Sequence, residues 1–315
     1  IDKNNNIETI SDYKEALNIP NIDGVIISTY GPSHYKIMKY AINKKIKNII
    51  CEKPFTIDPG HAWELDGLAK SLNRELILSF GWNYRPLVIS AKNLMEEHGV
   101  GKIQHVMVAM GSGTRELLKA TGDYEGAAAD FMPDWDTWTD PRLSGGGYAP
   151  AQLSHAMGLA LWLTNDRASQ VFAFMNNEDA RVDLHDAISI RYDSGATGTL
   201  SGASTPSAAN AVEEEGAPWS RHQLQVRIYG DEGQMIADLE RDFLWIYRED
   251  GLDEKVNLPD LAGLYLCDGP PSTLIDLTVG NGTPNRSPAD LGARTVEVIS
   301  AAYESVSSGL PVDAH

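Results

Sequence analysis

The residues best suited to chemistry form the stretch Glu52-Lys53-Pro54, which directly follows the apolar run 48–51. A continuous apolar run predicts a buried parallel strand, and Pro54 ends it because proline donates no ladder hydrogen bond. Glu52 and Lys53 then stand at the carboxyl end of the strand, where open α/β sheets bind ligands. A lysine that loses hydration there has a lowered pKa and suits proton transfer. The same two residues could equally be a surface ion pair that closes a strand.

A second candidate is the glycine triplet 145–147 with the helix expected from about 150 to 163. Glycines adopt positive φ and let the backbone pass close to a ligand. Gln152 and His155 are three residues apart, so they share one face of that helix. A histidine can transfer a proton there, but this segment taken alone favours a core residue that one hydrogen bond satisfies.

A third candidate is the segment 134–142, which contains two tryptophans, several aspartates and one arginine. Trp135 and Trp138 can stack on the C–H surface of a sugar, while Arg142 and the aspartates can bind hydroxyl groups. The same residues could equally form a loop that the two tryptophans anchor. The segment therefore leaves a sugar-binding role and a structural role open.

The composition is that of an ordinary globular chain, with 315 residues, 42% hydrophobic and 22% charged. The length predicts two domains. The formal net charge of -18 repels phosphate backbones, so we expect no nucleic-acid partner. We also expect no membrane span and no signal peptide. Two widely separated cysteines favour a reducing, cytoplasmic location and argue against a disulfide framework or a metal site.

The elements that must position these residues begin, after a short helix at 10–18, with alternating strands and helices. They are expected at 22–29 (strand), 30–45 (helix), 48–52 (strand), 58–73 (helix) and 75–81 (strand). This alternation implies right-handed crossovers and a parallel sheet of the doubly wound, dinucleotide-binding type. No G-x-G-x-x-G motif precedes residue 23, so we expect either a partial nucleotide domain or a site assembled in another way.

The pattern changes after residue 86. A helix at 88–97 and a strand at 102–111 precede an irregular stretch at 112–147, and residues 205–219 are expected to form a loop. Further strands are expected at 169–175, 182–193, 196–202, 222–229, 234–239 and 243–248. Turn sequences between them, such as Asp193-Ser194-Gly195, predict a mainly antiparallel sheet.

The predicted fold class is therefore α/β. A partial Rossmann-type nucleotide domain occupies residues 1–86, and an α+β domain with a large open, mainly antiparallel sheet occupies residues 87–287. The second domain would bind substrate. A final helix at about 288–308 packs back onto the first domain or bridges the two.

Three of these segments together resemble the Gfo/Idh/MocA family, named after glucose–fructose oxidoreductase, inositol dehydrogenase and rhizopine catabolism. The segments are, in chain order, Gly24 to Thr29 with Pro32 and His34, Cys51 to Pro54, and the glycine triplet with His155. The resemblance implies a carbinol oxidoreductase that uses NAD or NADP and acts on a sugar, cyclitol or related compound. It also implies a homo-oligomer, a dimer or tetramer, formed through the open sheet.

The resemblance implies roles for single residues. Lys53 and His155 correspond to the catalytic lysine and histidine of the family. The residues expected around the cofactor are Ser28, Thr29, Pro32, His34, Glu52, Lys53 and Trp82. The residues expected around the substrate are Lys53, Arg85, Trp135, Trp138, Arg142, Gln152 and His155.

One position departs from the family pattern. The family often carries an aspartate four residues before the histidine, and Ala151 occupies that position here. Gln152 can supply a hydrogen bond but cannot ionise, so the proton relay would depend on Lys53 and His155 alone.

The sequence thus predicts hydride transfer between nicotinamide and a carbohydrate carbinol. His155 would act as general base and Lys53 would stabilise the developing alkoxide. Two alternatives stay open: a glycosidase that retains its NAD and acts by oxidation and elimination, and a non-catalytic regulator that binds nucleotide or sugar.

Overall fold

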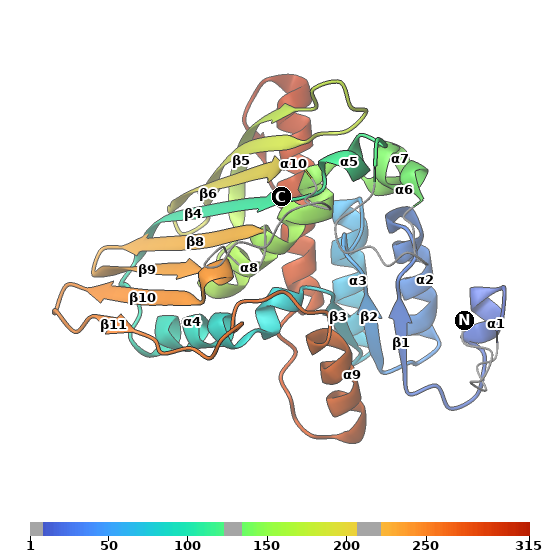
Figure 1. Ribbon diagram of the computed structural model, residues 1–315. Coiled ribbons are helices and arrows are strands. Elements are labelled where there is room, and N and C mark those ends of the chain that lie inside the picture. The colour runs from blue at the N-terminus through green and yellow to red at the C-terminus, as the bar shows by residue number, and fades with distance from the viewer. Residues whose placement is uncertain (1–8, 123–133, 207–221) are drawn as a thin grey trace.

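The computed structural model describes residues 9–122, 134–206 and 222–315, which form two sheets and the helices around them (Figure 1). The smaller sheet has the strand order β1-β2-β3, and the larger has the order β11-β10-β9-β8-β4-β7-β6-β5-β12. A small parallel sheet beside a large, mainly antiparallel one confirms the predicted fold class.

The smaller sheet is parallel throughout, as the alternation of elements predicts. Its elements are β1 (Gly24–Ile27), α2 (Gly31–Asn43), β2 (Asn48–Cys51), α3 (Pro59–Ser71) and β3 (Glu75–Leu78). The central strand, β2, is buried along its whole length, which explains its uninterrupted apolar run. The short helix α1 (Tyr13–Ala16) precedes the sheet and is capped by Asp12.

Local sequence explains where the two helices beside this sheet begin. Each has a proline in its first turn, where the missing N–H costs nothing. Asp58 caps α3, because its carboxylate accepts the backbone N–H of His61 at 2.8 Å. Met38 and Ile42 form the buried face of α2, one helical turn apart.

The larger sheet contains nine strands. They are β4 (Ile103–Ser112), β5 (Ala168–Asn176), β6 (His185–Tyr192), β7 (Thr197–Ser204), β8 (Gln223–Gly230), β9 (Gly233–Asp238), β10 (Phe243–Arg248), β11 (Glu254–Lys255) and β12 (Val312–Asp313). All pairs are antiparallel except β4 with β7, which are parallel. The two-residue strands β11 and β12 were not predicted because so short a strand leaves no alternation of side chains.

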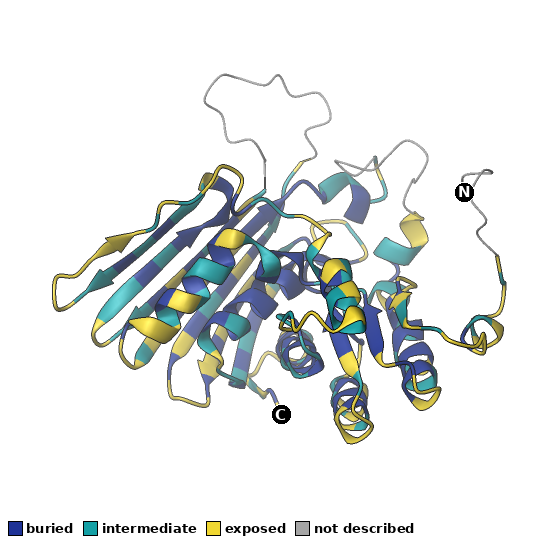
Figure 2. Ribbon diagram, turned by 90° about the horizontal axis from the view of Figure 1, so that it is seen from below, coloured by how far each residue is buried: buried dark blue, intermediate teal, exposed yellow. Residues whose placement is uncertain are grey.

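Helices contact this sheet through its buried positions, which alternate along the strands (Figure 2). They are α4 (Pro86–Glu97), α8 (Ser154–Thr164) and α10 (Ala289–Ser308). The last of these also contacts α3 and β3 of the smaller sheet. The final helix therefore bridges the two sheets, and the division into domains near residue 86 stays a prediction.

Several segments differ from the expectation. The stretch 112–147, predicted to be irregular, contains α5 (Arg115–Leu118), α6 (Trp135–Thr139) and α7 (Pro141–Ser144). Helices of four or five residues are too short to show a 3.6-residue period. Residues 123–133 of this stretch lie outside the described residues, as does nearly all of the loop predicted at 205–219.

Helical elements that the sequence did not predict are η1 (Gly81–Tyr84), η3 (Leu239–Arg241) and α9 (Gly269–Val279). In α9 the apolar side chains Ile275 and Val279 are exposed, so its sequence shows no clear buried face. Within the described ranges, no helix is long and apolar enough to cross a membrane.

A buried acid ties the bridging helix to both neighbouring parts of the structure. Glu297 of α10 accepts the indole N–H of Trp63 from α3 at 2.6 Å. It also accepts two guanidinium N–H groups of Arg167, at 2.6 and 3.1 Å, from the residues just before β5. The Arg167 guanidinium lies 5.0 Å from the centre of the Trp63 ring. One carboxylate therefore joins α3, α10 and the start of β5.

We predict that Glu297→Gln lowers the free energy of unfolding by about 2 kcal/mol, because a charged hydrogen-bond acceptor is lost in a buried site. Urea unfolding measures this change. Glu304→Gln, at an exposed position of the same helix, is the matched control and should change stability by less than about 0.5 kcal/mol. Equal effects of the two substitutions would contradict the bridging role of Glu297.

Candidate functional site

A cavity of about 310 Å³ lies at the carboxyl ends of β1 and β2. Its walls come from three places: the segments that follow these strands, the short helices α6 and α7, and the start of the helix before α8. The lining residues are Ser28, Thr29, Tyr30, Gly31, Lys53, Pro54, Thr137, Trp138, Leu143, Ser144 and Ala151. Four of the residues predicted from the sequence therefore share one cavity: Ser28, Thr29, Lys53 and Trp138.

The Lys53 side chain is part of the lining of this cavity. Its amine donates a hydrogen bond to the backbone carbonyl of Ala151 at 2.6 Å and lies 5.6 Å from the centre of the Trp138 ring. Burial lowers the pKa of Lys53, while the charge of Glu52 opposes that shift. The amine is thus held in a partly desolvated position by groups that are distant in the sequence.

His155 lies in α8, one helical turn after Ala151. Its ring is only 5% exposed and is surrounded by Phe80, Trp82 and Tyr265, whose ring centres lie 5.9, 5.4 and 5.4 Å away in edge-to-face geometry. Its buried Nδ1 has no hydrogen-bond partner among the described residues. The ring therefore has an unused polar atom in an aromatic enclosure.

Electrostatics connect this ring to the lysine. Burial lowers the pKa of His155 well below its usual value, and the charges of Lys53 and His222 lower it further. His155 follows Ala151, whose carbonyl holds the lysine, by four residues of continuous helical backbone. The ammonium and a neutral imidazole are consequently positioned by one helical turn.

His34 connects two of the segments that line the cavity. The buried ring of His34 has its nitrogens 2.7 Å from the carbonyl oxygen of Thr29 and 2.9 Å from that of Pro54. It therefore links the segment after β1 to the segment after β2. The Thr29 hydroxyl lies 2.6 Å from that of Ser33, and Pro32 occupies the first turn of α2 beside them. These residues shape the cavity edge.

The structure places other predicted residues away from this lining. Arg142 forms an ion pair with Asp140, which caps α7, and its side chain is 83% exposed. This pairing lowers the pKa of Asp140 to about 2. Trp135 is 41% exposed, although Trp138 of the same short helix lines the cavity. The cap that starts α7 thus turns the arginine outward.

Arg85 and Gln152 also lie outside the lining. Arg85 donates to the backbone carbonyl of Leu261 at 3.2 Å and lies 3.9 Å from the Asp268 carboxylate. Gln152 is buried within the turn that precedes α8. His155 itself is not among the lining residues, and Trp82 lies beside it, with the two ring centres 5.4 Å apart.

The backbone of the glycine triplet lies close to other segments of the protein. A Cβ atom at Gly146 would lie 1.9 Å from the Tyr303 hydroxyl, and one at Gly147 would lie 2.1 Å from the backbone oxygen of Asp183. Gly145 has φ of +80° and ends α7. The close approach that requires glycine here is therefore to Tyr303 and Asp183.

Tyr265 is a site residue that the sequence did not reveal. Its ring lies 4.4 Å from that of Trp82 and 5.4 Å from that of His155. Residues 256–268 contain no helix or strand and no recognisable motif, so nothing in the sequence pointed to this contact. The tertiary fold alone brings Tyr265 to the histidine.

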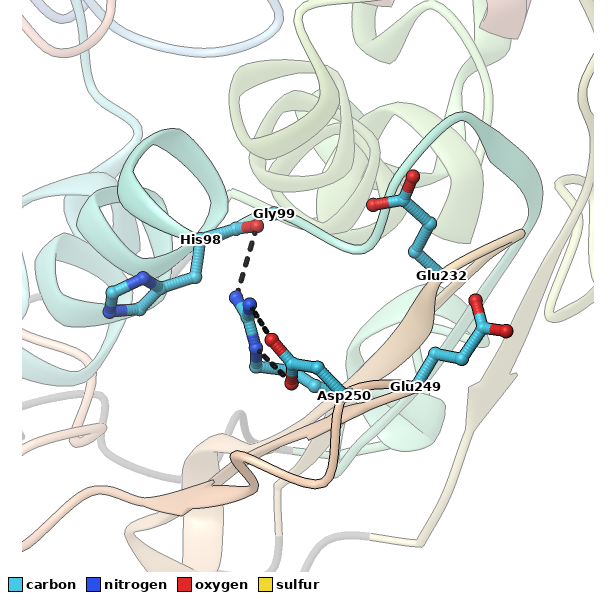
Figure 3. A pocket seen from close by; sticks show the side chains of 6 residues that line it. His98, Gly99, Glu232, Glu249 and Asp250 are labelled. Atoms are coloured by element: carbon cyan, nitrogen blue, oxygen red, sulfur yellow. Dashed lines mark hydrogen bonds and ion pairs between the residues drawn. The ribbon is translucent and has the colours of Figure 1, made fainter.

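A second cavity, of about 360 Å³, has a different character (Figure 3). It lies beside the end of α4 and the hairpin of β9 and β10, and carboxylates of Glu232 and Glu249 face it. The Arg248 guanidinium donates to the carboxylate of Asp250 at 2.9 Å and to the carbonyl of His98 at 3.2 Å. Arg248, the cation of this lining, is therefore already paired. Neither Lys53 nor His155 is among the residues that line this cavity.

Comparison with protein-family models agrees with the fold. Residues 1–80 match the model for the oxidoreductase family with an NAD-binding Rossmann fold, and residues 88–236 match the GFO/IDH/MocA C-terminal domain. The chain belongs to the Gfo/Idh/MocA oxidoreductase family, which confirms the predicted resemblance, and its N-terminal part is of the NAD-binding Rossmann type.

Curated relatives match over part of the chain. The uncharacterized oxidoreductase YdgJ of Escherichia coli is 32% identical over 99 residues, which are 31% of this chain and 28% of the relative. The inositol 2-dehydrogenase/D-chiro-inositol 3-dehydrogenase of Lactiplantibacillus plantarum is 28% identical over 95 residues, 30% of this chain and 27% of the relative. The matched stretch thus spans just over a quarter of these relatives.

Solved structures share the whole fold. An oxidoreductase domain protein from Kribbella flavida has a TM-score of 0.76 and 17% identity, covering 97% of this chain and 84% of that one. An inositol dehydrogenase homolog from Azotobacter vinelandii, complexed with NADH and myo-inositol, has a TM-score of 0.71 and 17% identity, covering 96% and 80%. At such identities these likenesses show the fold.

We predict that His155 stays neutral at pH 6, where a histidine with the ordinary pKa of about 6.5 is mostly protonated. Burial and the Lys53 charge both lower its pKa, so its titration midpoint must lie below that value. Nuclear magnetic resonance of the imidazole, assigned by its loss in His155→Gln, measures the midpoint. A midpoint at or above 6.5 would contradict the enclosed, neutral ring.

Proposed function

We propose that the protein is an NAD(P)-dependent oxidoreductase that transfers hydride between nicotinamide and a carbinol of a sugar, cyclitol or related carbohydrate. The observation that supports the proposal most is that the Lys53 amine binds the carbonyl of Ala151, four residues before His155, and that its charge lowers the pKa of the His155 imidazole. An ammonium and a neutral imidazole are the two groups that carbinol oxidation needs. The family assignment supports the same class of reaction.

The residues at the cavity edge suit a nicotinamide. Ser28 and Thr29 offer hydroxyl and backbone groups at the carboxyl end of β1, and Gly31 begins α2 there. A helix N-terminus and the carboxyl end of a parallel strand are the usual place for a dinucleotide in such folds. When bound, the nicotinamide ring supplies the hydride acceptor or donor. The choice between NAD and NADP is left to the experiment below.

The chain's own residues account for the proton. His155 is neutral, so its ring can accept the carbinol proton as general base. The Lys53 ammonium has three N–H donors. One binds the carbonyl of Ala151, so the others are available to the carbinol oxygen. Its charge weakens His155 as a base, and by the same electrostatics it stabilises the alkoxide that forms. In the reverse direction His155 returns the proton.

The surroundings favour this chemistry. Three aromatic rings around His155 exclude water, which strengthens the electrostatic effect of the lysine charge. Trp138 presents its ring beside the amine and suits the C–H face of a sugar. Cofactor contacts by Pro32, His34, Glu52 and Trp82 remain part of the proposal. Arg85, Trp135, Arg142 and Gln152 lie outside the cavity lining, so the substrate contacts proposed for them are weaker than that of Trp138.

The first prediction from this proposal concerns Lys53. Lys53→Met should preserve the fold and lower turnover by about a thousandfold, because the group that stabilises the alkoxide is lost. The assay follows reduced-nicotinamide absorbance with NAD or NADP in a screen of glucose, xylose and myo-inositol. Lys36→Met, at an exposed position of α2, is the matched control and should keep full activity.

The same screen separates the alternatives. Release of free sugar from a glycoside without net cofactor reduction would favour the NAD-retaining glycosidase. Saturable nucleotide or sugar binding without turnover of any carbinol would favour a non-catalytic regulator. Unchanged turnover in Lys53→Met would refute the proposed role of the lysine.

The second prediction concerns the two tryptophans of α6. Trp138→Ala should raise the KM for the carbohydrate about fivefold, because a stacked ring contributes roughly 1 kcal/mol. Trp135→Ala should raise KM less than about twofold, since its ring lies outside the cavity lining. Steady-state kinetics on both variants measures the difference. Equal effects would place the sugar over the outer face of the helix.

We also propose a homo-oligomer formed through the larger sheet. Residues that alternate with the buried ones point away from the helices, and among them Phe174 is 69% exposed and Met107 is also exposed. Apolar side chains on an open sheet face are typical of an interface between copies.

A further inference from the structure

A buried acid outside the cavity organises the backbone that leads into α8. The carboxylate of Asp183 accepts the N–H of Gly147 at 2.7 Å, the N–H of Ala149 at 2.9 Å and the hydroxyl of Tyr303. Its backbone oxygen accepts the N–H of Tyr148 at 2.9 Å. Asp183 thus satisfies three consecutive N–H groups at the start of a helix, where such groups lack partners within the helix.

The fit between these segments is close. No side chain can replace the hydrogen at Gly147, since a Cβ there would lie 2.1 Å from the Asp183 oxygen and 2.7 Å from its nitrogen. Real contacts of that kind stay beyond about 3 Å. Glycine at position 147 therefore allows the backbone to reach Asp183 just before the helix begins.

The catalytic candidates follow within two turns. Gly147 accepts the N–H of Ala151 at 3.1 Å, and the carbonyl of Ala151 accepts the Lys53 amine. The turn from Ala149 to Leu153 is π-helical, a form that occurs often at functional sites. His155 lies in the first turn of α8 after it. A shift at residues 147–149 would therefore displace both the lysine's acceptor and the histidine.

We propose that Asp183 is the positioning residue of the Lys53–His155 pair, because it holds residues 147–149 and thereby places the Ala151 carbonyl and the His155 ring. Its significance for catalysis rests on the proposed function, whereas its effect on the environment of Lys53 does not. Asp183 touches neither the cavity nor the two catalytic candidates, so it acts only through the helix start.

Asp186 provides a matched control within the same buried region. It is buried beside Asp183, and neither of its oxygens makes a hydrogen bond of good geometry to a described residue. Burial and the neighbouring Asp183 charge raise the pKa of Asp186 to about 9, so it is neutral at pH 7. Asp186→Asn therefore changes neither charge nor size greatly, whereas Asp183→Asn removes a charged acceptor from three donors.

The test measures the Lys53 amine directly. Limited acylation with acetic anhydride at several pH values, read by peptide mass spectrometry, yields the titration midpoint of each lysine. In Asp183→Asn the Lys53 midpoint should rise toward the ordinary value of about 10.4, because the loosened amine regains water. Asp186→Asn should leave it unchanged, and the exposed Lys36 should not shift in either variant.

Kinetics adds the catalytic part of the test. Asp183→Asn should lower kcat ten- to a hundredfold with little change in KM, while Asp186→Asn retains activity. An unchanged Lys53 midpoint in folded Asp183→Asn would overturn the positioning role, even if stability falls. If the Lys53 midpoint shifts in Asp183→Asn but the unsubstituted protein turns over no carbinol, the positioning role is upheld and the proposed function is refuted.

If Asp183→Asn does not fold, a milder variant tests the same proposal. Tyr303→Phe removes the hydroxyl donor but keeps the three backbone hydrogen bonds to Asp183. The Lys53 midpoint should then shift in the same direction by a smaller amount. No shift in Tyr303→Phe, when Asp183→Asn does not fold, would also overturn the proposal.

Discussion

One hydrogen bond joins the two halves of the site: the Lys53 amine, at the end of β2, donates to the carbonyl of Ala151, before α8. The donor belongs to the smaller, parallel sheet and the acceptor to the helix over the larger sheet. Every other feature of the site either places one of these groups or keeps water from them. Burial lowers the pKa of Lys53 and that of His155.

Each side of this bond has its own support. On the side of the smaller sheet, His34 links the carbonyls of Thr29 and Pro54, so the segments after β1 and β2 stay in register. On the other side, Asp183 holds the start of the helix. The bridging helix α10 connects both, since Tyr303 contacts Asp183 and Glu297 anchors Trp63 of α3. Relative placement of the two sheets is thus built from buried polar contacts as well as apolar packing.

Four buried titratable groups show how such groups are accommodated. Asp183 and Glu297 stay buried because several donors satisfy their oxygens, as buried charges require. Asp186 lacks such donors, and its raised pKa keeps it neutral. His155 likewise stays neutral with an unpaired Nδ1. The Nδ1 of His155, unpaired among the described residues, is therefore free to bind a further group, whereas the two satisfied acids are structural.

The sequence by itself determined the fold class and the order of the main strands and helices, and it pointed to Lys53 and His155 as the catalytic candidates. Those features depend on local patterns: apolar runs, proline and glycine positions, and a motif at the end of a strand. Only the tertiary structure decided which residues meet. It turned Arg142 toward Asp140, brought Tyr265 to His155 and set the glycine triplet against Asp183. The contacts of Tyr265 and of the glycine triplet join residues that are far apart in the chain. The Arg142 contact depends instead on Asp140, the capping residue of α7, which binds the arginine. Neither kind of contact leaves a periodic signal in the sequence.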